Sequence, residues 1–218
     1  MLHVDARSFG SSCRKLKITT TAAAAAGVDS LAAHHLAQQL WALYSLVLDS
    51  VAIAAQSLVG AALGAGLAAH CRALARAVVV WSLGLGAALA LLTVVFRAPL
   101  ASLLSGDPGV ADRLVVALIG MAVVVIPAAV VFGLDGVLLG AGDAAYLRTS
   151  TVVAALLGFL PVLLVTRYLG WGLPGIWVGM GVFVGLRLIA VVARVRGDRW
   201  MVLGAQTPGT RALQEVDG

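Results

Sequence analysis

The stretch Leu31–Gly66, LAAHHLAQQLWALYSLVLDSVAIAAQSLVGAALGAG, decides the fold class of this chain. It is mostly apolar, and as a helix rising about 1.5 Å per residue it would cross a hydrocarbon core of roughly 30 Å. Its polar residues recur at spacings of seven, four and seven, which places them within roughly 40° of one another on the helix surface: Gln38, Ser45, Asp49 and Gln56. His34 lies near the same line. The stretch predicts a membrane-spanning helix that carries a polar stripe.

Asp49 lies near the centre of this predicted helix. A carboxylate that faces lipid costs at least a few kcal/mol, so we expect Asp49 to face other helices or a water-filled cavity. One interpretation is a neutral acid that only joins helices through a hydrogen bond. The alignment of the polar residues favours the other, a hydrated pathway for an ion or substrate that is lined by His34, Gln38, Ser45 and Gln56.

The composition independently indicates a membrane protein. Hydrophobic residues make up 61% and charged residues 11% of the chain, and the mean hydropathy is +1.02. Soluble domains carry roughly 25% charged residues. The net charge of +5 would suit nucleic acid, but the basic residues lie between apolar runs and form no aromatic and basic face. We therefore predict lipid contact and no nucleic-acid partner.

Motifs for enzyme chemistry are missing from the sequence. It contains no GxSxG, HExxH or Walker A pattern, and Cys13 and Cys71 have no metal-ligand spacing. His34 and His35 are adjacent, so their side chains point about 100° apart on a helix and rarely share one metal ion. We predict no catalytic residue, no metal site and no cofactor.

We predict an all-α, polytopic membrane helix bundle. It has a polar basic segment at 1–18, a transmembrane lobe at 19–195 and a polar tail at 196–218. A short amino-terminal helix precedes five full spans, at about 31–64, 73–95, 113–139, 147–168 and 173–195. We expect Arg97 and Pro99 to close the second span.

The third predicted span contains the second acid inside a membrane segment, Asp135. One interpretation is an acid at a helix end in a glycine-rich turn, and the other is an ion-coupling residue. Gly136 and Gly140 have the spacing that lets two helices approach closely. In the fifth span we interpret Arg187 as a side chain that extends to the membrane interface.

Basic residues are more frequent on one side of the predicted membrane segments. That side holds the His70–Arg76 loop, the Gly140–Arg148 loop and the carboxy-terminal tail. The positive-inside rule then places these loops and the tail in the cytoplasm. We predict a multi-pass protein of the plasma membrane.

Three runs of the sequence together resemble one transporter family. AAHHLAQQLWALYSLVLDSVAIAAQSLVGAALGAG resembles the first long helix of the carboxy-terminal lobe of MATE (multidrug and toxic compound extrusion) transporters, in the DinF-like branch. VFGLDGVLLGAGDAAYLR resembles the matched later segment, and LGWGLPGIWVGM with RGDRWMVLGA resembles the closing helix and tail. The resemblance covers about Thr21 to Ala205, and it is specific because several motifs occur in the right order.

The resemblance implies one lobe of a twelve-helix antiporter built from two six-helix lobes. Such proteins export cationic or amphipathic organic compounds in exchange for H⁺ or Na⁺. Asp135 is the better match to a cation-coupling acid of the family, and Asp49 is the better candidate from the polar stripe. A cation and a proton would compete for the same carboxylate, which couples their opposite movements.

The chain departs from the family pattern because an amino-terminal lobe is missing. We interpret it as a truncated MATE-type transporter that is not competent as a lone monomer and would need that lobe or a second copy. The alternative is a helical membrane subunit that does not transport, or an inert gene fragment.

Overall fold

The computed structural model describes residues 6–169, 172–197 and 200–201, without the side chains of 6–26, 163, 166–167 and 172–174. Within these residues the secondary structure is helical, and no strand occurs. The elements are α1 (Ala6–Gly64), α2 (Ala68–Leu104), α3 (Pro108–Gly140), α4 (Ala144–Ala154), the π-helical turn η1 (Ala155–Phe159), α5 (Leu160–Leu169) and α6 (Gly172–Arg196).

Five helices of the described chain are long and apolar enough to cross a membrane. They cover Gly27–Gly64, Ala68–Leu104, Pro108–Gly140, Ala144–Val162 and Gly175–Arg196. The all-α membrane bundle predicted from the sequence is therefore confirmed. The predicted tail at 196–218 lies almost entirely outside the described residues, so the division into segment, lobe and tail remains a prediction.

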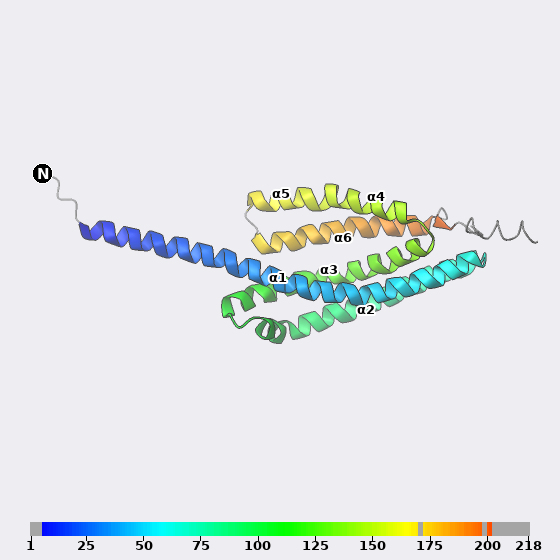
Figure 1. Ribbon diagram of the computed structural model, residues 1–218, viewed down its shortest axis with the longest axis horizontal. Coiled ribbons are helices and arrows are strands. Elements are labelled where there is room, and N and C mark those ends of the chain that lie inside the picture. Colours follow the sequence, from blue (N-terminus) through cyan, green and yellow to red (C-terminus); the bar gives the residue numbers. More distant parts are fainter. Residues whose placement is uncertain (1–5, 170–171, 198–199, 202–218) are drawn as a thin grey trace, which may run out of the picture.

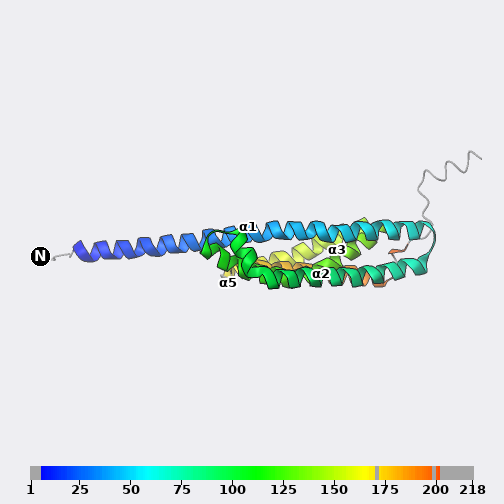
Figure 2. The same cartoon turned by 90° about the horizontal axis from the view of Figure 1, so that it is seen from below.

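The helices run up and down, so their connections gather at two ends of the bundle (Figure 1). The α1–α2 turn, the α3–α4 turn and the end of α6 lie at one end. The α2–α3 connection lies at the other, and the amino-terminal part of α1 projects beyond it. Seen from below, α1 and α2 lie side by side as an antiparallel pair (Figure 2).

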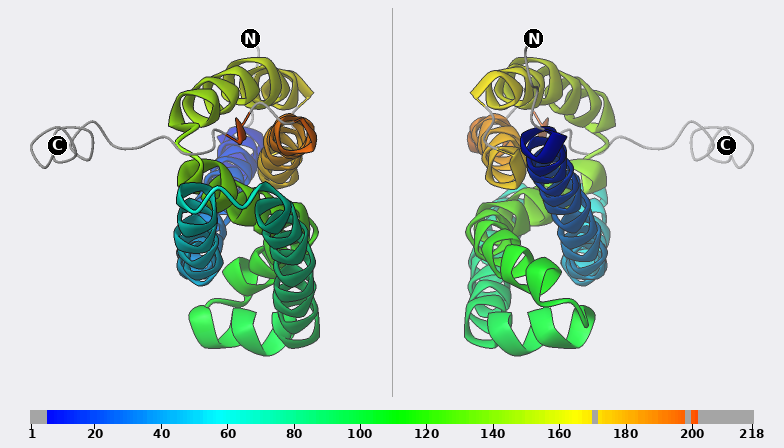
Figure 3. Two further views of the ribbon diagram at one scale, coloured as in Figure 1. Left: turned by 90° about the vertical axis from the view of Figure 1, so that its right-hand side faces the viewer. Right: turned by 90° about the vertical axis from the view of Figure 1, so that its left-hand side faces the viewer.

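Helix α3 is the central helix of the bundle (Figure 3). In its most apolar stretch of 18 residues, 61% are buried within the protein, whereas the corresponding share in the other four spans is between 22% and 28%. Packing is closest against α1, α2 and α6. The sequence makes Leu31–Gly66 the most conspicuous stretch, but the fold is organised around α3, whose side chains are apolar on nearly every side.

Two glycines of α3 allow it to lie against the backbone of α1. A Cβ atom at Gly140 would lie 2.5 Å from the backbone oxygen of Gln56, and one at Gly136 would overlap the backbone of Ala52. Gly136 and Gly140 are four residues apart in α3, and their contacts Ala52 and Gln56 are four residues apart in α1, in the same order. Helices α1 and α3 are therefore parallel and in fixed register. The close approach predicted from this glycine spacing is confirmed.

Two helix boundaries differ from the prediction. No separate short helix precedes the first span, because α1 runs unbroken from Ala6 to Gly64. Helix α2 also continues through Pro99 to Leu104 instead of ending there. A transmembrane helix tolerates an internal proline, because local adjustments and neighbouring groups satisfy the freed carbonyl. In the fourth span, the π-helical turn η1 immediately precedes the segment that contains Pro161.

The turns follow the local sequence signals. Gly66 and Gly142 have φ values of +73° and +77°, which residues with a side chain rarely adopt. Each glycine follows the end of a helix. Asp107 caps α3 by accepting a hydrogen bond of 2.7 Å from the Gly109 N–H, with Pro108 as the first helical residue. These turns set the antiparallel order of the first four spans.

Candidate functional site

An ion pair joins the two deepest charged residues of α3 and α6. The Arg187 Nη2 donates to Asp135 Oδ1 at 2.8 Å and to Oδ2 at 2.7 Å. The two side chains are only 14% and 21% exposed, respectively. A buried charge needs such a partner, because the charge of either residue alone would be poorly solvated.

The ion pair borders a cavity of about 200 Å³ between α1, α3 and α6. Trp41 of α1, Phe132 of α3 and Phe183 of α6 contribute aromatic rings to the same cavity. Aromatic faces attract organic cations, and a carboxylate adds a full negative charge. The cavity therefore combines the carboxylate of Asp135, which could pair with another cation in place of Arg187, with a lining of aromatic side chains.

Asp49 lies close enough to Asp135 to interact with it electrostatically. The helix register explains this, because Ala52 packs on Gly136 and Asp49 lies one turn before Ala52. The side chain of Asp49 is exposed in this chain. The structure therefore brings the two sequence-predicted acids to neighbouring positions on α1 and α3. Among the described residues, Asp135 is paired with a base and Asp49 is not.

The other residues of the polar stripe have different surroundings. Gln38 and Gln56 are exposed, while Ser45 is half-buried and donates to the Trp41 carbonyl of its own helix at 3.0 Å. His34 is half-buried, and its Nε2 lies 3.5 Å from Gln38 Nε2. The assignment of these residues to a pathway remains a prediction.

Aromatic contacts connect the start of this stripe to α6. The ring of Trp177 lies edge-on to His34 at 6.5 Å and to Trp41 at 6.4 Å between centroids. The indole Nε1 of Trp177 and the Nδ1 of His34 are buried without a hydrogen-bond partner among the described residues. Polar atoms are thus available where α1 meets α6.

Sequence reasoning missed the role of Arg187. The prediction of a side chain extending to the interface is wrong, since Arg187 pairs with Asp135 inside the bundle. A usable signal was present, because an acid and a base in different apolar spans each need a counter-charge.

A second ion pair fixes the α3–α4 turn to the end of α6. The Arg194 Nε donates to Asp143 Oδ2 at 2.6 Å, and its guanidinium lies 4.8 Å from the centroid of the Tyr146 ring. Tyr146 in turn donates to the Ala190 carbonyl at 2.9 Å. These contacts fix the end of α6 that lies beyond Arg187.

Metal-binding clusters do not occur in the described part of the chain, where no three His, Cys, Asp or Glu side chains converge. His34 and His35 have ring centroids 6.5 Å apart, with the rings tilted by 50°. Cys71 is buried and free, and Cys13 lies among the residues whose side chains are not described. The candidate functional site is the cavity between α1, α3 and α6, because the Asp135–Arg187 pair borders it.

The fold and this site define a polytopic helical membrane protein with a buried ion pair beside an aromatic cavity. Comparison with known families then assigns the chain more closely. The MatE family matches residues 13–164, and the chain belongs to that family.

Three curated relatives come from Arabidopsis thaliana. The chain is 28% identical to Protein DETOXIFICATION 45, chloroplastic, over 86% of its own length and 34% of the relative. It is 31% identical to Protein DETOXIFICATION 44, chloroplastic, over 85% of its length and 36% of the relative. It is 28% identical to Protein DETOXIFICATION 43 over 79% of its length and 32% of the relative. The chain thus spans about a third of the length of these relatives, and no solved structure matches it.

Proposed function

We propose that the chain is the carboxy-terminal lobe of a MATE-type secondary transporter of the DinF-like branch. It would export small organic compounds, often cationic, in exchange for H⁺ or Na⁺. Membership of the MatE family and similarity to proteins named for detoxification support a transport role. Because the chain spans about a third of these relatives, we propose that it works with an amino-terminal lobe or with a second copy.

The observation that carries this proposal is the Asp135–Arg187 pair at the wall of the cavity. A buried carboxylate has three possible partners here: the arginine, a coupling ion and an organic cation. Binding of a proton to Asp135 would remove its charge and release Arg187, which weakens one link between α3 and α6. The arrival of a cation would compete with the proton for the same oxygens, so export and ion entry would alternate.

Asp49 would extend the negative field of the site toward α1. It lies near Asp135 and is exposed in this chain, so an opposing lobe could cover it. The aromatic side chains of Trp41, Phe132 and Phe183 would hold the organic part of the substrate, since they line the cavity beside the ion pair.

The experiment is efflux of a fluorescent lipophilic cation, ethidium, from an efflux-deficient bacterial host. The chain is expressed alone and together with the amino-terminal lobe of a full-length MATE protein, and membrane abundance is checked by immunoblot. We expect efflux with the added lobe, and efflux from the chain expressed alone would indicate that a second copy takes the place of that lobe. In either case efflux should be lost in Asp135→Asn and Asp49→Asn. Asp112→Asn is the matched control, because Asp112 is an exposed acid near the start of α3.

The outcomes separate the transporter from the alternative. Equal efflux by wild type and both Asn variants would assign the two acids to packing. No efflux in either arrangement, at normal membrane abundance, would favour a helical membrane subunit that does not transport.

We further propose a plasma-membrane location with the carboxy terminus in the cytoplasm. The excess of arginine at the end of the bundle that holds Arg72, Arg76, Arg148 and Arg196 supports this orientation. Alkaline phosphatase fused to the tail should be inactive and a fluorescent protein at the same position bright. The opposite pair of results would reverse the orientation.

A further inference from the structure

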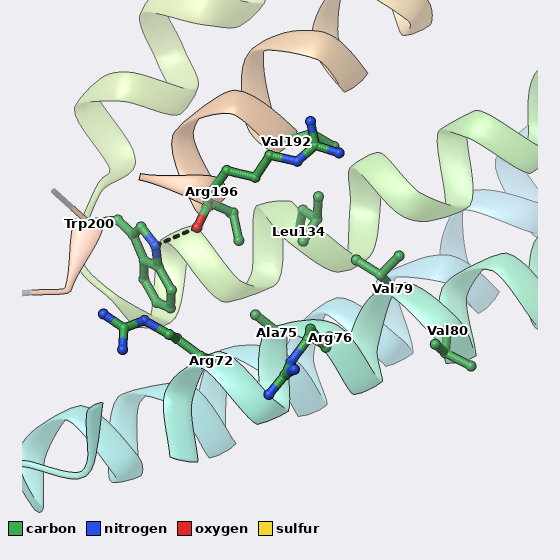
Figure 4. Close-up of a pocket in the computed structure, with 10 residues that line it drawn as sticks. Arg72, Ala75, Arg76, Val79, Val80, Leu134, Val192, Arg196 and Trp200 are labelled. Carbon is green, nitrogen blue, oxygen red and sulfur yellow. Dashed lines mark hydrogen bonds between the residues drawn. The ribbon is translucent and has the colours of Figure 1, made fainter. Parts of the chain in front are cut away.

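A second cavity, of about 770 Å³, lies between α2, α3 and α6 (Figure 4). It lies toward the end of the bundle that holds the α1–α2 turn. Its floor is apolar and is formed by Ala75 and Val79 of α2, Leu134 of α3, and Val192 and Val195 of α6. Such a floor suits a hydrocarbon chain and offers little to a small ion.

Three arginines border the same cavity, two from α2 and one from α6. Figure 4 shows Arg72 and Arg76 on α2 and Arg196 on α6, with Leu134 between the two helices. Arg76 and Arg196 are exposed, and neither has an ion-pair partner among the residues that the structure describes. The rim is therefore cationic over an apolar interior.

Trp200 closes one side of this cavity. It is 2% exposed, and its Nε1 donates to the Val195 carbonyl at 3.0 Å. This bond fixes the indole against the end of α6. Tryptophan has an apolar body and one polar atom, which suits the boundary between hydrocarbon and lipid headgroups.

The arginines lie near the ends of their helices, where a membrane-spanning helix would meet the headgroup region. Arg76 lies about 12 Å from the first residue of α2, Ala68, because a helix rises about 1.5 Å per residue. Arg196 is the last residue of α6. Long arginine side chains at this depth place their charge at the interface. The apolar floor continues from there toward the hydrocarbon core.

We propose that this cavity binds an anionic phospholipid. The phosphate would lie among Arg72, Arg76 and Arg196, and an acyl chain would follow the floor past Val79 and Leu134. Basic pockets between membrane helices are a known type of site for anionic headgroups. Charge complementarity favours an anionic lipid over a zwitterionic one, since the cationic group of the latter would be repelled. The apolar floor favours a lipid over free phosphate.

This site is independent of the transport proposal, but it shares two helices with the ion pair. Leu134 of the floor directly precedes Asp135, and Val192 lies between Arg187 and the end of α6. A lipid seated here would therefore contact both helices that carry the pair.

The test is native mass spectrometry of the purified full chain in a non-ionic detergent. Dioleoyl phosphatidylglycerol, dioleoyl phosphatidylcholine and glycerol 3-phosphate are titrated separately. We compare Arg76→Gln/Arg196→Gln with a control of equal charge, Arg97→Gln/Arg148→Gln, because those two arginines are exposed outside the cavity. A further variant, Val79→Phe, fills the floor without changing the charge.

We expect the wild type to prefer phosphatidylglycerol to phosphatidylcholine, and the Arg76/Arg196 variant to bind phosphatidylglycerol about tenfold more weakly or worse. The affinity of the control variant for phosphatidylglycerol should change by less than about twofold. Val79→Phe should weaken the binding of the lipid but not that of glycerol 3-phosphate. Equal binding of both lipids by the wild type, or equal loss in the control, would overturn the proposal. So would glycerol 3-phosphate binding as tightly as the lipid, which would indicate a small-anion site. Circular dichroism confirms that each variant remains folded.

Discussion

Arg187 of α6 donates to both carboxylate oxygens of Asp135 in α3, at 2.8 and 2.7 Å, across 52 residues of sequence. Both residues lie in segments that are long and apolar enough to span a membrane. The pair therefore links the central helix of the bundle to its last helix at the wall of a cavity.

We predict that this pair contributes measurably to stability. Arg187→Met leaves Asp135 without its partner, and the free energy of unfolding should fall by about 3 kcal/mol, the lower end for a buried pair, because the Asp135 side chain is 21% exposed. The double variant Asp135→Asn/Arg187→Met removes both charges and should recover much of that loss. Thermal unfolding in detergent measures both changes.

Arg97→Met is the control for the loss of one arginine, because Arg97 is exposed and, within the part of the chain that the structure describes, bonds to the Val94 carbonyl of its own helix. It should change stability by less than about 0.5 kcal/mol. Additive losses in the Asp135/Arg187 double variant would contradict a direct interaction between the two residues.

The contact between α1 and α3 predicts a sharp difference between two glycines. Gly136→Ala would place a Cβ atom into the backbone of Ala52 and should destabilise the protein by roughly 1–3 kcal/mol. Gly84→Ala is the control, because a Cβ atom there meets nothing within 4 Å and should be neutral or slightly stabilising. Thermal unfolding that ranks these variants in the opposite order would refute the close approach.

A hydrogen bond between α1 and α2 gives a prediction of smaller size. The Tyr44 hydroxyl lies 2.8 Å from Thr93 Oγ1, which itself donates to the Leu89 carbonyl at 2.7 Å. Tyr44→Phe should cost about 1 kcal/mol of stability, since Thr93 retains its other bond. Tyr168→Phe should have no effect, because Tyr168 is 91% exposed.

The polar stripe of α1 predicts a pattern of chemical labelling. Cysteines at Gln38, Ser45, Asp49 and Gln56, introduced after replacing Cys13 and Cys71 by serine, should react with a water-soluble thiol reagent in intact membranes. Cysteines at Leu46 and Val47 should react less, because we predict that this face contacts lipid. Faster labelling at Leu46 and Val47 would show that the stripe does not line a hydrated pathway.

The sequence by itself determined the fold class, whereas the roles of Asp49 and Asp135 remain predictions. Length and apolarity are local properties, so the five spans could be predicted without knowing their partners. The spacing of Gly136 and Gly140 predicted a close helix contact.

Only the tertiary structure decided which side chains meet. The partner of Asp135, the central place of α3 and the arginine-rimmed cavity of Arg76 and Arg196 all depend on how separate helices cross. Helical periodicity gives the face of a residue on its own helix, but not the register of that face against a helix many residues away. That register is set by packing along whole helices, such as the contact of Gly136 with Ala52.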